Sequence, residues 1–166
     1  MTLELELTSV HFADGGLGVH WTRTQDGQVL SVLFDHMKVD SGVKDGDVAP
    51  EVQHAEGSVR CIGSGFVTVQ VRGATIVTGM HGYAHATGWA NGRRLRAAPG
   101  PSDEPFVMST VAPVSQDGQL RLSLLLLAQR DLLEPNSAAA CWIDSIDIVV
   151  VPEPRSRPDQ VDSIGS

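Results

Sequence analysis

Residues 117–128 have the sequence DGQLRLSLLLLA, and this stretch decides which fold class we expect. Asp117-Gly118 is typical of a tight turn, and the leucines at alternate positions 120, 122, 124 and 126 fall on one face of a strand. Leucine and the segment 129–133 also favour a helix. The turn and the strict alternation favour a strand followed by a short turn instead. The stretch therefore predicts a β-strand with one buried face.

The same alternation recurs on both sides of this stretch, between Gly-containing turns. The expected extended segments are 3–8, 17–22, 28–39, 59–71, 75–89, 106–111, 120–128 and 140–151. Asp26-Gly27 joins the second and third segments as a hairpin, and apolar residues on both faces of 28–39 indicate a central strand. Residues 40–57 contain three glycines and five acidic residues with little periodicity, so we expect a long acidic loop there.

About eight extended segments with almost no helical periodicity predict an all-β fold. We expect a single-domain antiparallel β-sandwich, jelly-roll-like, over residues 1–151, with a closed β-barrel as the alternative that pattern alone does not separate. Residues 152–166 are rich in proline, which removes backbone donors, so we expect a disordered tail.

Length and charge limit the class of protein. The 166 residues fit one domain, and 12 Lys and Arg against 20 Asp and Glu give an acidic protein of net charge −8. Such a charge repels phosphate backbones and anionic lipids, so we expect neither a nucleic acid nor a membrane as partner. The start, Met-Thr-Leu-Glu, has no basic residue and no apolar run typical of a secretion signal, which predicts a cytoplasmic protein.

The segment 79–89, GMHGYAHATGW, is the richest in chemistry-bearing side chains. If it is extended, alternation puts the side chains of His81, Tyr83, His85 and Trp89 on one face. Two imidazoles and a phenol there offer acid–base or hydrogen-bonding groups. We therefore predict these four residues as ligand-binding and the first three as candidate catalytic residues. The simpler interpretation is the wet outer face of a surface strand.

No metal or cofactor is expected. His81 and His85 lie roughly 13 Å apart along a strand, too far to share one ion. The acidic loop lacks the spacing of an EF-hand, which favours a solvated surface loop over a calcium site, and a lid over a pocket is a third interpretation. No Gly-rich phosphate loop of a standard form occurs in the chain.

Two further pairs of residues have structural interpretations. Asp144 and Asp147 fall on opposite faces of an otherwise apolar strand, and we expect them to pair with arginines, for which the candidates are Arg60, Arg72 and Arg121. Cys61 and Cys141 lack the spacing of a zinc site, so we expect them to pack in the core; the sequence leaves their disulfide state open.

Several short elements in the middle of the chain also suggest a relationship. They are LSVLFD at 30–35, Cys61 before a valine-rich strand, Arg72-Gly73, Gly79, and Cys141 followed by Asp144-Ser145. Over about residues 28–148 the chain resembles a β-rich family of unknown function whose members are usually secreted. The resemblance implies a sandwich fold and no known activity.

Three functions follow from these patterns. The first is a small-molecule-binding β domain of unknown ligand. The second is a cofactor-independent cyclase or isomerase that acts inside a β-barrel pocket. The third is a structural or oligomerising β domain, because leucine-rich and valine-rich strands are able to bury an interface between copies of the chain. Whether the protein is an enzyme, and which ligand or substrate it takes, stay open at this point.

Overall fold

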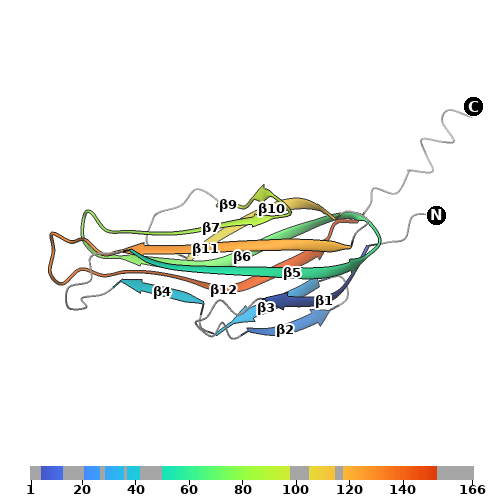
Figure 1. Ribbon diagram of the computed structural model, residues 1–166, viewed down its shortest axis with the longest axis horizontal. Coiled ribbons are helices and arrows are strands. Elements are labelled where there is room, and N and C mark those ends of the chain that lie inside the picture. The colour runs from blue at the N-terminus through green and yellow to red at the C-terminus, as the bar shows by residue number, and fades with distance from the viewer. Residues whose placement is uncertain are drawn as a thin grey trace, which may run out of the picture.

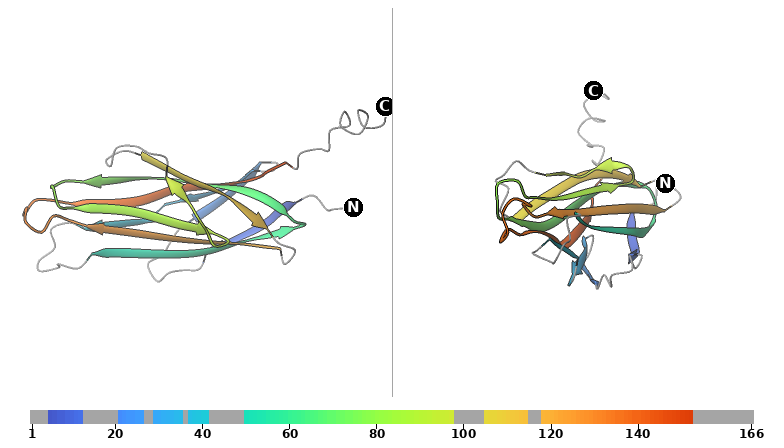
Figure 2. Two further views of the ribbon diagram at one scale, coloured as in Figure 1. Left: turned by 90° about the horizontal axis from the view of Figure 1, so that it is seen from above. Right: turned by 60° about the vertical axis from the view of Figure 1, so that its left-hand side comes forward.

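A computed structural model shows two antiparallel β-sheets packed face to face (Figures 1 and 2). It describes residues 5–12, 21–26, 29–35, 37–41, 50–97, 105–114 and 118–152. These residues form strands and turns, and they include no helix that is able to span a membrane. The predicted β-sandwich is confirmed. The alternative of a closed barrel is wrong, because the two sheets do not close on each other.

The first sheet has five strands in the order β1-β5-β11-β7-β8. The strands are β1 (Glu6–Phe12), β5 (Glu51–Ile62), β11 (Gln119–Gln129), β7 (Tyr83–Ala90) and β8 (Arg93–Arg94). The leucine stretch of 117–128 lies in β11, at the centre of this sheet, where it pairs with β5 on one side and β7 on the other. The predicted strand is therefore confirmed, and the helical alternative is wrong.

The second sheet has seven strands. Six follow the order β2-β3-β12-β6-β10-β9, and β4 pairs with β12 off this path. The strands are β2 (Trp21–Asp26), β3 (Val29–Phe34), β4 (Lys38–Ser41), β6 (Gly65–Val77), β9 (Arg96–Ala97), β10 (Pro105–Val114) and β12 (Ala139–Val150). The predicted hairpin is confirmed, since β2 and β3 pair over their whole lengths.

The core lies between the two sheets. Leu120, Leu122, Leu124 and Leu126 of β11 are all buried on the inner face, as their alternation predicts. They contribute to one cluster with the inward residues of the second sheet, such as Ile146 of β12. The described side chains between the sheets are mainly apolar, so most polar side chains lie on the outer faces.

Two segments differ from the expectation. The prediction of an acidic loop over 40–57 is wrong at both ends, because β4 includes residues 40 and 41 and β5 begins at Glu51; residues 42–49 lie outside the described residues. Burial of Gln53, Ala55 and Val59 on alternate positions shows what holds this start of β5 in the sheet. The expected strand 28–39 is divided into β3 and β4.

The segment 75–89 is also not one ribbon. β6 ends at Val77, the chain turns through residues 78–82, and β7 begins at Tyr83. Gly79 has a φ of 97°, a backbone conformation that residues with a Cβ rarely adopt. A Cβ added there would lie 2.7 Å from the Cβ of Asp131. The expected strand 3–8 corresponds to β1, although residues 1–4 lie outside the described part, as does most of the predicted tail, residues 153–166.

Candidate functional site

The four predicted ligand-binding residues do not gather in one pocket. Tyr83 and His85 lie on the outward face of β7 with their ring centroids 5.7 Å apart and their planes 33° apart. Both side chains are exposed. Trp89 shares this face at the other end of β7, and His81 lies in the turn before the strand. The prediction that His81 joins the strip is therefore wrong, because the turn at 78–82 interrupts the alternation.

His81 instead contacts Asp131, so that the turn at 78–82 is linked to the segment that follows β11. Its backbone N–H donates to Asp131 Oδ2 at 3.0 Å, and its Nδ1 lies 3.4 Å from the same oxygen. Asp131 Oδ1 also accepts a bond from the N–H of Leu133 at 2.9 Å. These bonds to the backbone N–H groups of His81 and Leu133 lower the pKa of the Asp131 carboxyl, which is only 1% exposed. The contacts explain the position of His81 structurally.

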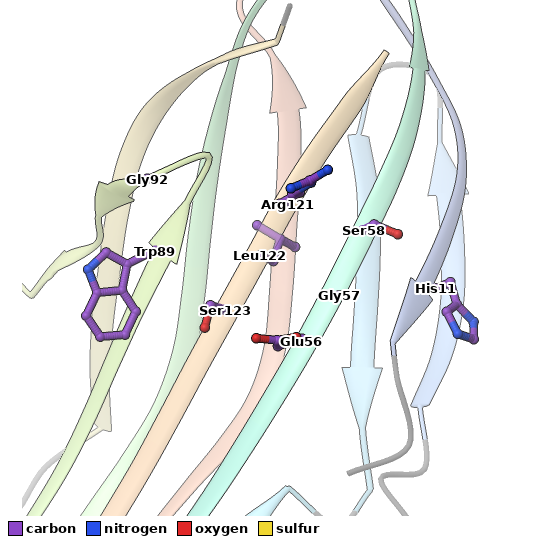
Figure 3. A pocket seen from close by; sticks show the side chains of 9 residues that line it. All are labelled: His11, Glu56, Gly57, Ser58, Trp89, Gly92, Arg121, Leu122 and Ser123. Carbon is purple, nitrogen blue, oxygen red and sulfur yellow. The ribbon is translucent and has the colours of Figure 1, made fainter. Parts of the chain in front are cut away.

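The hollow with the most varied chemistry lies on the outer face of the five-stranded sheet (Figure 3). It is an open groove of about 460 Å³ that crosses the strands from β1 to β7 and the turn after β7. Its lining residues are His11, Glu56, Gly57, Ser58, Trp89, Gly92, Arg121, Leu122 and Ser123. We call this hollow the outer groove.

The strand register explains how distant parts of the chain meet in the outer groove. Trp89 of β7 lies opposite Ser123 of β11, which lies opposite Glu56 of β5. In the next row Arg121 lies opposite Ser58, and Ser58 lies opposite His11 of β1. Since directly opposite residues project to the same side of a sheet, these two rows place all their side chains outward. Three strand spacings separate Trp89 from His11, or roughly 14 Å.

The two rows of the outer groove supply complementary chemistry. Figure 3 shows the indole of Trp89 at one end of the groove, on the side of β7 away from Ser123, with one broad face turned toward the viewer. Ser58 and Ser123 add hydroxyl groups, Glu56 adds acceptors and Arg121 adds donors. The arrangement thus combines one aromatic surface with hydrogen-bonding groups of both kinds.

Part of this polar lining is held in place by His54 of β5. Its Nε2 lies 3.0 Å from Ser123 Oγ and 3.8 Å from Glu56 Oε1. All three side chains sit at or near the surface, so solvent screens the His54–Glu56 pair and its contribution to stability is small. The hydrogen bond with His54 restricts the orientation of Ser123.

Sequence reasoning found only Trp89 among the lining residues. Glu56 was assigned to a loop, and His11 and Ser58 had no assigned role. Arg121 and Ser123 alternate with buried leucines in β11, and this pattern signals an outward face. The signal does not reveal which strands lie beside that face, so the sequence alone does not assemble the site.

The aspartates of β12 have the structural role that we expected for one of them. Asp147 accepts a bond from Ser31 Oγ at 2.6 Å and lies 4.0 Å from Arg72 Nε, one of the three predicted partners. Asp144 is exposed, because the register shifts between Ile143 and Ser145 and reverses the alternation beyond this irregularity. Our assignment of the two aspartates to faces, which assumed a regular strand, was therefore wrong.

Both cysteines are free and buried, one in each sheet. Burial raises the pKa of Cys61 to about 11 and that of Cys141 to about 12. Within the described ranges no group of three or more His, Cys, Asp or Glu side chains is arranged to hold a metal ion.

Comparison with known proteins adds no relationship. No protein-family model matches the chain, and no curated protein matches it significantly. The resemblance to a β-rich, usually secreted family therefore stays a prediction, and the site must be interpreted from its own geometry.

Proposed function

We propose that this β-sandwich is a small-molecule-binding domain whose ligand lies in the outer groove, against Trp89. The observation that carries the proposal is the combination of an indole face with two hydroxyls, a carboxylate and a guanidinium in one hollow. A volume of about 460 Å³ is within the range of ordinary ligand sites. Indole is well suited to such a role, because it offers a large apolar surface at little cost in conformational entropy.

The chemistry of the lining favours a polar, hydroxylated ligand. The groove is open to solvent and offers side-chain donors and acceptors in two rows, whereas apolar ligands favour enclosed apolar cavities. Tyr83 and His85 lie on the same outward face of β7 but beyond the groove. In this proposal they extend the surface and do not contact the ligand directly.

The enzyme alternative has less support. It required the interior of a closed barrel, whereas the two sheets enclose a core of packed side chains. The candidate acid–base residues His81, Tyr83 and His85 are all exposed, and His81 is turned toward Asp131. We therefore do not propose a reaction.

Self-association is a second candidate function, favoured by the opposite surface of the molecule. The outer face of the seven-stranded sheet carries large apolar side chains that are 37–49% exposed. They are Val29, Leu33, Phe66, Val107 and Val111. Apolar sheet faces of this kind often bury against a partner. Light scattering at high protein concentration tests the idea: a dimer that Val111→Lys dissociates supports it, and a strict monomer contradicts it.

Nuclear magnetic resonance of the full chain tests the binding proposal. The probes are small polar compounds at millimolar concentration: glucose, glucuronate, inositol and citrate. We expect at least one of them to shift the indole signal of Trp89 together with the amide signals of Ser58 and Ser123. Shifts confined to other surfaces, or no shifts with any probe, would contradict the proposal.

Two tryptophan variants make the test specific. Trp89→Ala should weaken binding by about tenfold, the loss expected when about 1.4 kcal/mol of contact is removed. Trp142→Ala is the matched control, because Trp142 is also half-buried on an outer face but belongs to the other sheet, beside Lys38. Equal losses in both variants would show that the effect is not specific to the outer groove.

A further inference from the structure

We infer that the ligand of the outer groove is an acidic oligosaccharide, a chain of sugar rings that carry carboxylate groups. This inference rests on the proposed function and names the ligand class for the same site. It follows from three features of the groove: its aromatic end, the charge around that end, and its length.

Two arginines lie near the aromatic end of the groove. Arg94 of β8 lies opposite Trp89 in the register, and Arg121 lines the groove itself. Arg93 and Arg96 are exposed too but do not belong to the groove, because Arg93 lies opposite the buried Ala90 and donates to the Val111 oxygen of β10, and Arg96 is in β9 of the seven-stranded sheet. The end of the groove near Trp89 is therefore a local region of positive charge.

On the strands that carry Trp89 and the two arginines there is no acidic residue, and Glu56 of β5 is the carboxylate that lines the groove among the described residues. The segments 83–97 and 119–129, which form β7, the following turn, β8, β9 and β11, contain no Asp or Glu. Within the described residues no ion pair joins Arg94 or Arg121 to a carboxylate. Arg94 and Arg121 thus have guanidinium groups available, and guanidinium is the donor best matched to a carboxylate.

The remaining lining favours sugar rings as the carrier of that carboxylate. A pyranose ring presents C–H groups on its face, which pack on an indole, and hydroxyl groups at its rim. Ser58, Ser123 and Glu56 form the continuation of the groove away from Trp89, where they offer acceptors and donors for such hydroxyls. The carboxylate of Glu56 repels a second anionic group at its own position, so we expect the carboxylate of the ligand to lie near Trp89.

Groove length favours an oligomer over a single ring. The outer groove crosses four strands, so its ends are separated by roughly 14 Å, several times the width of one sugar ring. A single-stranded nucleic acid is a poorer fit, because it stacks successive bases on several aromatic side chains and this groove is lined by one indole.

Isothermal titration calorimetry of the full chain tests the inference with defined probes. The acidic probes are hexamers of galacturonate, mannuronate and glucuronate, and the comparison probes are a neutral glucose hexamer, monomeric galacturonate and adenosine monophosphate. We expect one acidic hexamer to bind about fivefold or more tightly than each comparison probe, and its affinity to fall as salt is raised.

Charge variants assign the effect to the arginines. Arg94→Gln and Arg121→Gln should each weaken binding of the acidic hexamer by about two- to fivefold, and the double variant by about tenfold. Binding of the neutral hexamer should weaken less than that of the acidic hexamer in each variant, because it loses hydrogen bonds but no charge pairing. Arg23→Gln is the matched control, because Arg23 is an exposed arginine of β2 in the other sheet. Unfolding curves of all variants should coincide with that of the parent.

Each other outcome overturns the inference in a distinct way. If the neutral hexamer binds as tightly as the acidic ones and Trp89→Ala abolishes its binding, the acidic class is wrong while the proposed function stands. If adenosine monophosphate binds most tightly at Trp89, the sugar class is wrong. If no probe binds at about 1 mM and the small polar compounds leave Trp89 unshifted, both proposals fail.

Discussion

Asn91 holds the turn between β7 and β8 in place, and its replacement gives a quantitative test of the site's framework. Asn91 and Gly92 have φ values of 47° and 80°, the left-handed pair typical of a two-residue hairpin turn. The Asn91 side chain donates to the carbonyl oxygens of Pro113 at 2.7 Å and Gln119 at 3.2 Å, and its Oδ1 accepts from the N–H of Arg121 at 2.7 Å. The turn is thereby bonded to strands of both sheets.

The expected loss of stability comes from these bonds and from the backbone. Asn91→Gly removes all three side-chain bonds but keeps the left-handed conformation accessible, so at about 1 kcal/mol per bond it should cost about 3 kcal/mol. Asn91→Ala loses the same bonds but, unlike the Gly variant, keeps a Cβ at positive φ, so it should be about 1 kcal/mol less stable than Asn91→Gly. The difference between the two variants isolates the backbone contribution.

Urea unfolding followed by circular dichroism measures both quantities. In thermal unfolding of a domain of this size, the same loss of about 3 kcal/mol corresponds to a fall in melting temperature of about 6–12 °C. Arg94→Gln, an exposed substitution in the strand that follows the turn, is the control and should leave the curve unchanged. Asn91→Gly as stable as the parent would refute the role of the hydrogen bonds. Equal stability of the Gly and Ala variants would refute the proposed strain from a Cβ at the positive φ of residue 91.

Three further predictions concern groups away from this turn. Asp131→Asn should destabilise the protein near pH 7 and reduce its sensitivity to acid. Folding lowers the pKa of the Asp131 carboxyl, so this group stabilises the fold above its ordinary pKa of about 3.8, and the contribution is lost as pH falls through the lowered pKa. Urea unfolding at about pH 7 and about pH 2 measures the difference. Iodoacetamide should alkylate Cys61 and Cys141 slowly in the folded protein, since burial raises both pKa values, and rapidly in urea; mass spectrometry that shows fast labelling of the folded protein would contradict their burial. Leu126→Ala should cost about 2–5 kcal/mol and Leu127→Ala about 1 kcal/mol, because only the first points into the core; similar losses in urea unfolding would rule out the alternation of β11.

The fold class was predictable because it depends on local patterns. In β11, every second residue is a leucine over 120–126, and no helical face accommodates that spacing as well as a strand does. The hairpin of β2 and β3 likewise follows from Asp26-Gly27 between two alternating segments. Each of these signals is contained within about a dozen residues, so the pairing of distant strands was not needed.

The break between β6 and β7 was missed because its cause lies far away in the sequence. The turn at 78–82 is stabilised by Asp131, whose carboxylate accepts the N–H of His81 fifty residues earlier. Gly79 gave a local hint, but a glycine inside a strand pattern is equally consistent with a bulge. Asn91-Gly92 is a stronger local signal, because this dipeptide is typical of a two-residue hairpin turn, and it joins β7 to β8.

The site was less predictable than the fold for the same physical reason. Trp89, Ser123 and Glu56 come from three strands, and only the sheet order β5-β11-β7 makes them neighbours. Alternation within a strand shows which residues face outward together, but it carries no information about which strand lies alongside. The predicted strip therefore followed β7, whereas the outer groove crosses it.

The two outer faces differ in chemistry, and this difference separates the two candidate functions. Arg121, Ser123 and Glu56 face outward from the five-stranded sheet, while Phe66 and Val111 are exposed on the other. The two faces lie on opposite sides of the packed core, so an interface formed by the apolar face leaves the outer groove open. Val111→Lys should then alter the oligomeric state without changing the affinity for a sugar hexamer, and Trp89→Ala should do the reverse. If either variant changes both the oligomeric state and the sugar affinity, the two faces are coupled through the core, and the proposal that they have separate functions is wrong.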